Sequence, residues 1–344
     1  PAKTCPDTLA QAYERDITGG MIDAHEPVSL CPVEGNAYAG QPGLQVTDQH
    51  GQSLLPLFKL QDVDAAANHL ILKYRDKTCG LSYEARIETA LTPGIWRLSA
   101  SLAADQPVLV HWLAAPVFPA ADYMQCLQEF GGRWVGEFKR HERQWGPSAL
   151  VRENRTGRTG HEYFPGLLVS SKMATNTHGE VYAWHYGWSG GHKMVAEALP
   201  DGRRQVQFGH VSGSYRGLAR QFHSADLFVV YSDQGVNGVS VPMQRLVRDE
   251  ILPQGFAAKP RPVHYNCWEA IYFDHSMEKL SDLARQVAHL GAERFVLDDG
   301  WFGQRDDDTT SLGDWVIHSG KYPSGLQPLI TAVQAQGMGF GLWF

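Results

Sequence analysis

The strongest constraint on the fold is a repeat in the last third of the chain, where three apolar runs alternate with two amphipathic segments. The apolar runs start near residues 263, 294 and 338, and the amphipathic segments cover 276–291 and 324–337. A strand, a helix and a second strand in this order form a parallel pair with a right-handed crossover. The repeat therefore predicts three β/α units with parallel strands from residue 263 onward.

Residues with capping preferences delimit the two predicted helices. The first helix is expected to begin at Ser276 as N-cap and to end at Gly291; the second should begin with a Ser324–Gln327 capping box and end at Gly337. A doubly wound sheet and an eight-stranded barrel both begin with such units, but a barrel typically needs ~250 residues. Because the sequence stops at Phe344, within or just after an apolar strand, we expect a fragment of a longer protein.

Residues 1–236 have the pattern of an antiparallel β domain. Short apolar runs alternate with turn signals rich in Gly, Asp and Pro, for example at 69–75, 95–102, 179–188 and 226–235. This spacing predicts a large β-sandwich. The segment 119–150 fits both helix and strand, and we favour strand.

A helix and a linker are predicted between the two domains. From Asn237 to Ile251, apolar side chains recur every three to four residues between charged ones, which is typical of an amphipathic helix. The following stretch, PQGFAAKPRP, is rich in Pro and Gly, as interdomain linkers are. The expected organisation is therefore a β domain at 1–236, a connecting helix and linker at 237–262, and the β/α units at 263–344.

Charge and cysteine content exclude several kinds of partner. The formal net charge of -7 leaves no basic stripe to neutralise nucleic-acid phosphates. No stretch approaches the ~18 consecutive apolar residues of a membrane span, and no signal-peptide pattern is visible, so we expect a cytoplasmic protein. The absence of CxxC spacing favours reduced thiols over disulfides or a zinc site for the 5 cysteines, Cys5, Cys31, Cys79, Cys126 and Cys267.

Asp298 and Asp299 are the candidate binding residues, because they stand side by side where the second parallel strand ends. Parallel β/α folds carry their sites at this edge of the sheet. Like charges resist burial together, so the pair needs cationic or hydroxyl-rich partners. Gly300 lets the backbone turn, and two carboxylates converging on neighbouring hydroxyls would bind a sugar. The alternative is a pair of loop aspartates, one of which caps a turn.

Two tryptophans flank the same edge. Trp268 ends the first strand of the repeat, and Trp301 follows the two aspartates. Either indole could stack on the apolar face of a sugar, and the alternative for each is packing in the core. Glu269 is a carboxylate at the same strand end, but no feature of the sequence makes it a catalyst.

Two other motifs are interpreted as loops. Asp306, Asp307 and Asp308 are consecutive, whereas a calcium loop needs acidic residues at alternate positions, so a solvated loop is favoured. The sequence GWSGG around Ser189 matches the G-x-S-x-G nucleophile pattern, but it lies in antiparallel β sequence and no helix follows. We therefore expect a hairpin loop there.

Three segments resemble the opening of the catalytic barrel in glycoside hydrolase family 36, the bacterial-type α-galactosidases. They are NCWEAIYFD, LGAERFVLDDGWFGQRDDDTTSLGDW and GMGFGLWF, and VYSDQGVNGVSVPMQRLVRDEIL is similar to the segment that precedes the barrel. Before residue 228 the resemblance is carried only by GHEYFPGLLV and HGEVYAWHYGWSGG. It implies a β-sandwich of the supersandwich type, followed by the first three β/α units of a truncated (β/α)8 TIM-type barrel.

The resemblance also implies a function. Asp298 and Asp299 would hold galactose hydroxyls on the O4/O6 side, Trp268 would line the sugar, and the substrate would be an α-galactoside such as melibiose or raffinose. The chemistry of the family is retaining hydrolysis by two carboxylates, with no metal or other cofactor. Its catalytic pair lies on later barrel strands, so we assign no catalytic residue within this chain and expect the pair beyond Phe344.

Two departures and several alternatives accompany this resemblance. Cys267 stands where the family usually shows another small residue, often Ser. Residues 34–46 only loosely resemble a loop that reaches a neighbouring subunit in some members, which leaves a homo-oligomer open. Rival functions are an α-N-acetylgalactosaminidase, a galactosyltransferase of the raffinose-synthase kind, a non-catalytic carbohydrate-binding protein and, more remotely, a serine hydrolase built on Ser189.

Overall fold

The computed structural model describes residues 29–344 except 37, 200–201, 254 and 257. The chain divides into two compact units, Pro1–Pro253 and Gln254–Phe344. This division falls inside the segment 237–262 that the sequence analysis assigned to a connecting helix and linker. Each unit has a hydrophobic core of its own.

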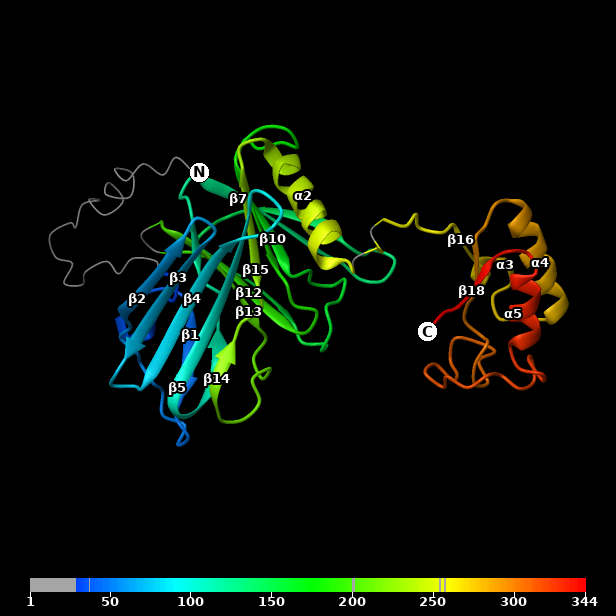
Figure 1. The fold of residues 1–344 in the computed structure, drawn as a ribbon, viewed down its shortest axis with the longest axis horizontal. Helices are drawn as coiled ribbons and strands as arrows, with labels where there is room; N and C mark the ends of the chain where they lie inside the picture. The colour runs from blue at the N-terminus through cyan, green and yellow to red at the C-terminus, as the bar shows by residue number, and fades with distance from the viewer. Residues whose placement is uncertain (1–28, 37, 200–201, 254, 257) are drawn as a thin grey trace. The chain divides into compact units, whose positions relative to one another are not determined.

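Two antiparallel sheets form the first unit (Figure 1). Within the described residues the larger sheet has 11 strands in the order β2-β3-β4-β5-β15-β11-β10-β7-β8, and β1 and β14 also pair with β5. The smaller sheet has 4 strands, ordered β6-β13-β12-β9. A short helix η1 (Glu34–Asn36) precedes the strands, which are β1 (Leu44–Thr47), β2 (Lys59–Ala66), β3 (His69–Asp76), β4 (Leu81–Thr89), β5 (Ile95–Leu113), β6 (Phe118–Ala120), β7 (Met124–Gly131), β8 (Lys139–Gln144), β9 (Leu150–Asn154), β10 (Gly166–Ser171), β11 (Val181–Tyr186), β12 (His192–Ala198), β13 (Arg204–His210), β14 (Ala219–His223) and β15 (Leu227–Ser232).

The alternation of side chains along each strand explains how the two sheets hold together. In β4, Leu81, Tyr83 and Ala85 are buried and the residues between them are partly exposed. A hydrophobic cluster shared by both sheets contains Trp184 of β11 in the larger sheet and Phe208 of β13 in the smaller one. The sheets therefore pack face to face through one core.

Two predictions about individual segments in this unit have definite outcomes. The strand interpretation of 119–150 is confirmed, since β7, β8 and the first residue of β9 lie within it. The GWSGG segment is a loop, as expected, but it is not a hairpin loop, because it joins β11 of the larger sheet to β12 of the smaller sheet. Cys31, Cys79, Cys126 and Cys267 are free thiols, and Cys5 lies outside the described residues.

The predicted connecting helix belongs to the first unit. Helix α2 (Gly235–Leu246) continues as a π-helical turn, η2 (Val247–Ile251), and α2 contacts β11 and β15 (Figure 1). Oε1 of Glu250 in this turn accepts hydrogen bonds from the backbone N–H and the hydroxyl of Thr92, each at 2.6 Å. The C-terminal end of the helix is thereby fixed to the β4–β5 connection.

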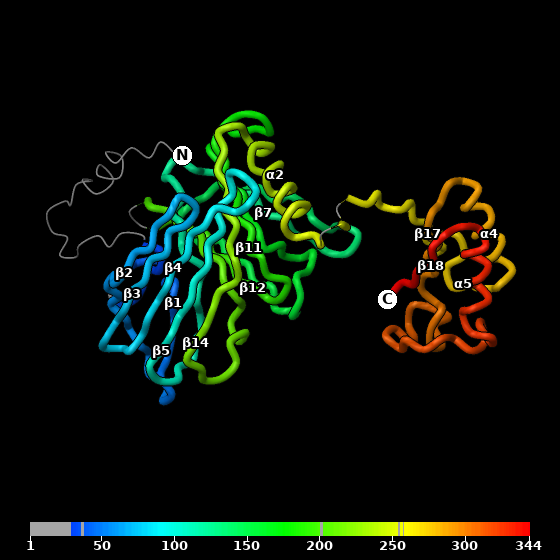
Figure 2. Tube along the Cα trace, viewed as in Figure 1, coloured from blue at the N-terminus to red at the C-terminus, as the bar shows by residue number. Residues whose placement is uncertain are grey.

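Three parallel strands and their helices form the second unit, as the repeat predicts. Strands β16 (His264–Asn266), β17 (Arg294–Leu297) and β18 (Gly339–Leu342) are adjacent in chain order. The helices are α3 (Trp268–Ile271), α4 (Met277–His289) and α5 (Gln327–Gln334). Helices α4 and α5 lie side by side, and their apolar faces share one core with β17 (Figure 2).

The start of α5 differs from the prediction. The expected capping box at Ser324 is wrong, because the N-cap is Leu326, without a side-chain hydrogen bond, and the helix begins at Gln327. Gly325 has a φ of 70° and forms a turn just before the helix. This turn uses the residues that a capping box at Ser324 would have required.

Ser276, in contrast, is the N-cap of α4, and its loss should cost about 1 kcal/mol of stability. Its hydroxyl oxygen accepts a hydrogen bond from the backbone N–H of Lys279 at 3.2 Å. Urea denaturation of Ser276→Ala measures the loss. Ser281→Ala, the same change inside the helix, is the control and should cost little because Ala is the better helix former. Equal losses for both would contradict the capping role.

Candidate functional site

The candidate site lies at the carboxyl edge of the three parallel strands. The register pairs Asn266 with Val296 and Leu297 with Leu342, so the residues that follow the strands meet at one edge. These residues are Cys267 and Trp268 after β16, Asp298 and Asp299 after β17, and Trp343 after β18. The edge is the one that the sequence analysis selected.

Neutral donors hold Asp298 in place. Its side chain is buried, and its Oδ2 accepts a hydrogen bond from the side-chain amide of Asn266. Its Oδ1 accepts the backbone N–H of Asp299 at 2.7 Å, and its own N–H lies 3.5 Å from the sulfur of Cys267. Cys267 therefore contacts the backbone of Asp298.

A guanidinium group holds Asp299. Nε and Nη2 of Arg305 donate to Oδ1 and Oδ2 of Asp299 at 2.9 and 3.0 Å, a bidentate ion pair. Asp299 is 6% exposed and Arg305 is 5% exposed. The hydrogen bonds with Asp299 raise the pKa of Arg305 above its ordinary value, so the guanidinium carries its charge here.

Arg305 answers the question of how two adjacent carboxylates tolerate burial. The sequence analysis required cationic or hydroxyl-rich partners for the pair, and the resemblance pointed to substrate hydroxyls. Within the chain itself, Asp299 has a cationic partner and Asp298 an amide partner. Arg305 was missed, although it stands only six residues after Asp299, because the sequence gives no sign that the loop folds back.

The loop between Gly300 and Tyr322 is closed at its base. Gly300 has a φ of 96°, and a Cβ there would lie 3.2 Å from the Phe273 ring and 3.4 Å from the carbonyl oxygen of Arg305. Nζ of Lys321 donates to the carbonyl oxygens of Gly300 and Arg305 at 3.2 and 3.0 Å. These contacts hold the end of the loop close to the end of β17, and Arg305 is buried within the loop.

A buried histidine and a buried tyrosine contact each other near the same edge. Nδ1 of His275 lies 2.7 Å from the hydroxyl of Tyr322, and both side chains are buried. Burial lowers the pKa of His275 to about 4, and the Lys321 cation adds to the effect. Burial also raises the pKa of Tyr322. The two groups are therefore neutral near pH 7.

The sequence analysis expected Trp268 to end a strand, and this is wrong. Trp268 is the first residue of helix α3. The side-chain oxygen of Asn266 accepts the backbone N–H of Trp268 at 2.8 Å and turns the chain out of β16. The indole is partly exposed and meets the rings of Tyr272 and Phe273 edge-on, at 5.1 and 5.0 Å between centroids. Trp268 therefore lies at the edge of the candidate site with part of its indole exposed.

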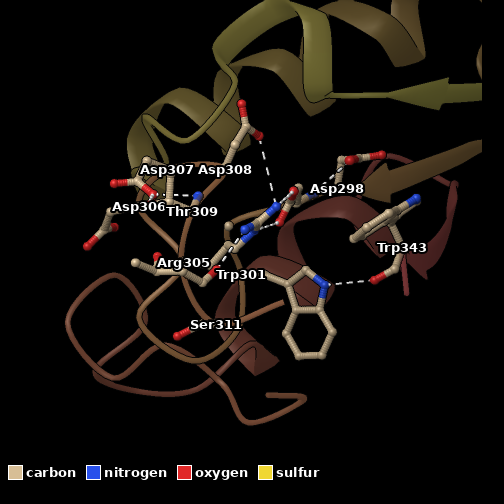
Figure 3. A network of polar contacts seen from close by, with 12 residues as sticks. Asp298, Trp301, Arg305, Asp306, Asp307, Asp308, Thr309, Ser311 and Trp343 are labelled. Atoms are coloured by element: carbon tan, nitrogen blue, oxygen red, sulfur yellow. Dashed lines mark hydrogen bonds and ion pairs between the residues drawn. The ribbon is translucent and has the colours of Figure 1, made fainter. Parts of the chain in front are cut away.

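Trp301 and Trp343 differ in how far they are exposed at this edge. Trp301 is 3% exposed and belongs to the core cluster, so its ring faces are not available to a ligand. Its Nε1 donates to the backbone oxygen of Trp343 at 2.9 Å (Figure 3). Trp343 is 36% exposed at the end of β18. The rule that placed Trp268 at a strand end also applies to Trp343, which the sequence analysis did not single out.

The remaining motifs contribute loop contacts. Asp306 pairs with Lys321 at 2.8 Å, and Asp307 accepts the backbone N–H of Thr309 at 2.7 Å. In the part of the chain that the structure describes, no group of three or more His, Cys, Asp or Glu could hold a metal ion. Ser189 lies between strands of different sheets, so it has no nucleophile-elbow geometry. None of the described helices is long and apolar enough to cross a membrane.

At the carboxyl edge of parallel β/α units, where such folds carry their sites, buried carboxylates can accept hydrogen bonds from hydroxyls and partly exposed indoles can pack against an apolar ring face. Two family models match the chain: the glycosyl hydrolase family 36 N-terminal domain over residues 6–213, and Melibiase over residues 221–344. The chain therefore belongs to glycoside hydrolase family 36.

Known relatives agree with this assignment. The chain is 37% identical to an α-galactosidase of Escherichia coli over 98% of its own length and 48% of the relative. It thus spans about half the length of that relative. The crystal structure of the α-galactosidase AgaA from Geobacillus stearothermophilus superposes with a TM-score of 0.82 and 28% identity, over 91% of this chain and 47% of that one. An α-galactosidase structure from Lactobacillus brevis gives 0.82 and 26%, over 91% and 45%. Variants of AgaA were crystallised with stachyose and with raffinose.

Proposed function

We propose that the protein to which this chain belongs is an α-galactosidase that releases terminal α-linked galactose from oligosaccharides such as melibiose or raffinose. The observation that carries the proposal is the buried Asp298–Asp299 pair at the carboxyl edge of β17, with the indole of Trp268 beside it. The names of the relatives and the stachyose and raffinose complexes of AgaA support the substrate class.

Each proposed role follows from the chemistry of the side chain. The carboxylate oxygens of Asp298 and Asp299 accept hydrogen bonds from sugar hydroxyls, and such charged hydrogen bonds are about twice as strong as neutral ones. Trp268 offers an aromatic surface to the apolar face of the ring, and Trp343 offers a second one across the edge. None of these four residues is proposed as nucleophile or acid/base.

The proposed architecture of the chain is a supersandwich followed by the first three units of a (β/α)8 barrel. Retaining hydrolysis needs two carboxyl groups about 5–5.5 Å apart, one to attack and one to protonate the leaving oxygen. We place that pair in the half of the relatives' length that residues 1–344 do not span. The chain then supplies sugar-binding groups to a reaction completed by later strands.

Hydrolysis of para-nitrophenyl α-galactoside tests this function. A protein of the full family length that contains this chain should release nitrophenol, whereas residues 1–344 alone should not. The N-acetylgalactosaminide analogue and transfer from galactinol to sucrose test the two rival enzymes. Preference for either rival substrate would overturn the proposed specificity, and folded full-length protein without turnover would favour a binding role. Activity of residues 1–344 alone would contradict the assignment of the catalytic pair.

A further inference from the structure

The two aspartates of the candidate site have unlike surroundings. Asp298 is held by an amide and a backbone N–H, which are neutral. Asp299 is held by a guanidinium through both of its oxygens. Among the described residues, the cation that binds the pair directly is Arg305.

Arg305 is itself fixed on every side. Its Nη1 donates to the backbone oxygen of Thr310 at 2.6 Å, and its guanidinium carbon lies 5.7 Å from the centroid of the Phe273 ring. Lys321 binds its backbone oxygen at 3.0 Å. Each of the three guanidinium nitrogens donates at least one hydrogen bond within the protein, and the residue is 5% exposed, so Arg305 is held by the protein itself.

Asp299, in contrast, has capacity left. A carboxylate offers about four lone-pair positions, and Arg305 occupies one on each oxygen. One position on each oxygen remains for a hydroxyl donor, and the fork of the guanidinium fixes the plane in which these positions lie. The orientation of the Asp299 carboxylate thus depends on Arg305.

We propose that Arg305 is a positioning residue: it holds the carboxylate of Asp299 in one plane, so that the remaining lone pairs meet the hydroxyls of the bound sugar. Arg305 acts through Asp299 and does not touch the sugar. This inference rests on the proposed function. The competing explanation is that the ion pair serves only to close the loop of residues 300–322.

The test is Arg305→Lys in the full-length enzyme, with para-nitrophenyl α-galactoside and its four monodeoxy analogues. A lysine can donate from one point but cannot bind both carboxylate oxygens in a plane. We expect kcat/KM for the parent substrate to fall by about 10- to 100-fold. For the analogue that lacks the hydroxyl bound by Asp299, the wild type and the variant should agree within about twofold. Arg285→Lys, an exposed change on helix α4, is the control and should alter neither value.

The possible results separate the two explanations. An equal loss on all five substrates, with a lower Tm, would show that Arg305 only maintains the loop, and unchanged kinetics would also overturn the inference. Arg305→Gln is the second variant; if neither variant folds at the assay temperature, the pair is a folding element and the inference is withdrawn. Absence of galactosidase activity in the wild type would refute the proposed function as well. If the wild type is active, a negative result for the Arg305 variants contradicts only the inference about Arg305.

Discussion

An Asp299→Ala variant should lose about 3–5 kcal/mol of unfolding free energy, the usual cost of leaving one member of a buried ion pair without its partner. Arg305 is 5% exposed, and Asp299 accepts two hydrogen bonds from its guanidinium, at 2.9 and 3.0 Å. Without the carboxylate, a desolvated cation would remain between Phe273 and the loop. Urea unfolding followed by tryptophan fluorescence measures the loss, because Trp301 lies in the same core.

Asp308 provides the matched control, since it approaches the same guanidinium from the solvent side. Its carboxylate lies 3.9 Å from Nη2 of Arg305, and its side chain is 82% exposed. Surface ion pairs contribute about 0–1 kcal/mol, so Asp308→Ala should change stability little. If Asp299→Ala costs no more than Asp308→Ala, the bidentate pair does not carry the stability assigned to it.

The second large effect is acid lability, to which the buried His192 of the first unit contributes. Its side chain is 0% exposed, and neither ring nitrogen has a hydrogen-bond partner among the residues that the structure describes. Burial lowers the pKa of His192 from 6.5 to about 4, with a smaller contribution from His185. The folded state thus binds this proton less readily than the unfolded state does.

The sign of the pH dependence follows from that difference. The stability contribution of neutral His192 is fully present above pH 6.5 and is lost as the pH falls from 6.5 toward 4. One proton taken up on unfolding corresponds to about 1.4 kcal/mol per pH unit, or about 3 kcal/mol over this window. Thermal unfolding at half-unit pH steps measures the slope.

His192→Leu should make that slope shallower by about one proton and should not lower stability at pH 7, because it removes two buried nitrogens without partners. His161→Leu, which removes an exposed imidazole from the same unit, is the control and should leave the slope of the wild type in place. A wild-type stability that does not change between pH 6.5 and 4.5 would show that His192 is not the acid-sensitive group.

Periodicity predicted the strands and helices because burial acts on every residue of an element at once. Leu280, Ala284 and Val287 mark the buried face of α4, and their spacing alone indicates a helix. The ends of elements depend on single contacts, and there the prediction was less accurate. Asn266 takes the backbone N–H of Trp268 and ends β16 early, and the turn at Gly325 replaces the cap expected at Ser324.

The candidate site was predictable in its place but not in its polar partners. The edge of the sheet and Asp298 and Asp299 follow from the order of strands and helices alone. Arg305 comes from an irregular loop, whose path is decided by tertiary contacts such as that of Lys321 with Gly300. No residue pattern in the sequence signals such a contact.

The closed base of that loop has a consequence for its tolerance of changes in length. Lys321 binds the carbonyl oxygen of Gly300, and most of the residues from 306 to 317 between them are exposed. The entropy of closing a loop grows only slowly with its length, so insertions or deletions in the exposed part cost little once the base is fastened. Changes of length in the exposed part of this chain should therefore cost little stability while Asp298 and Asp299 keep their positions.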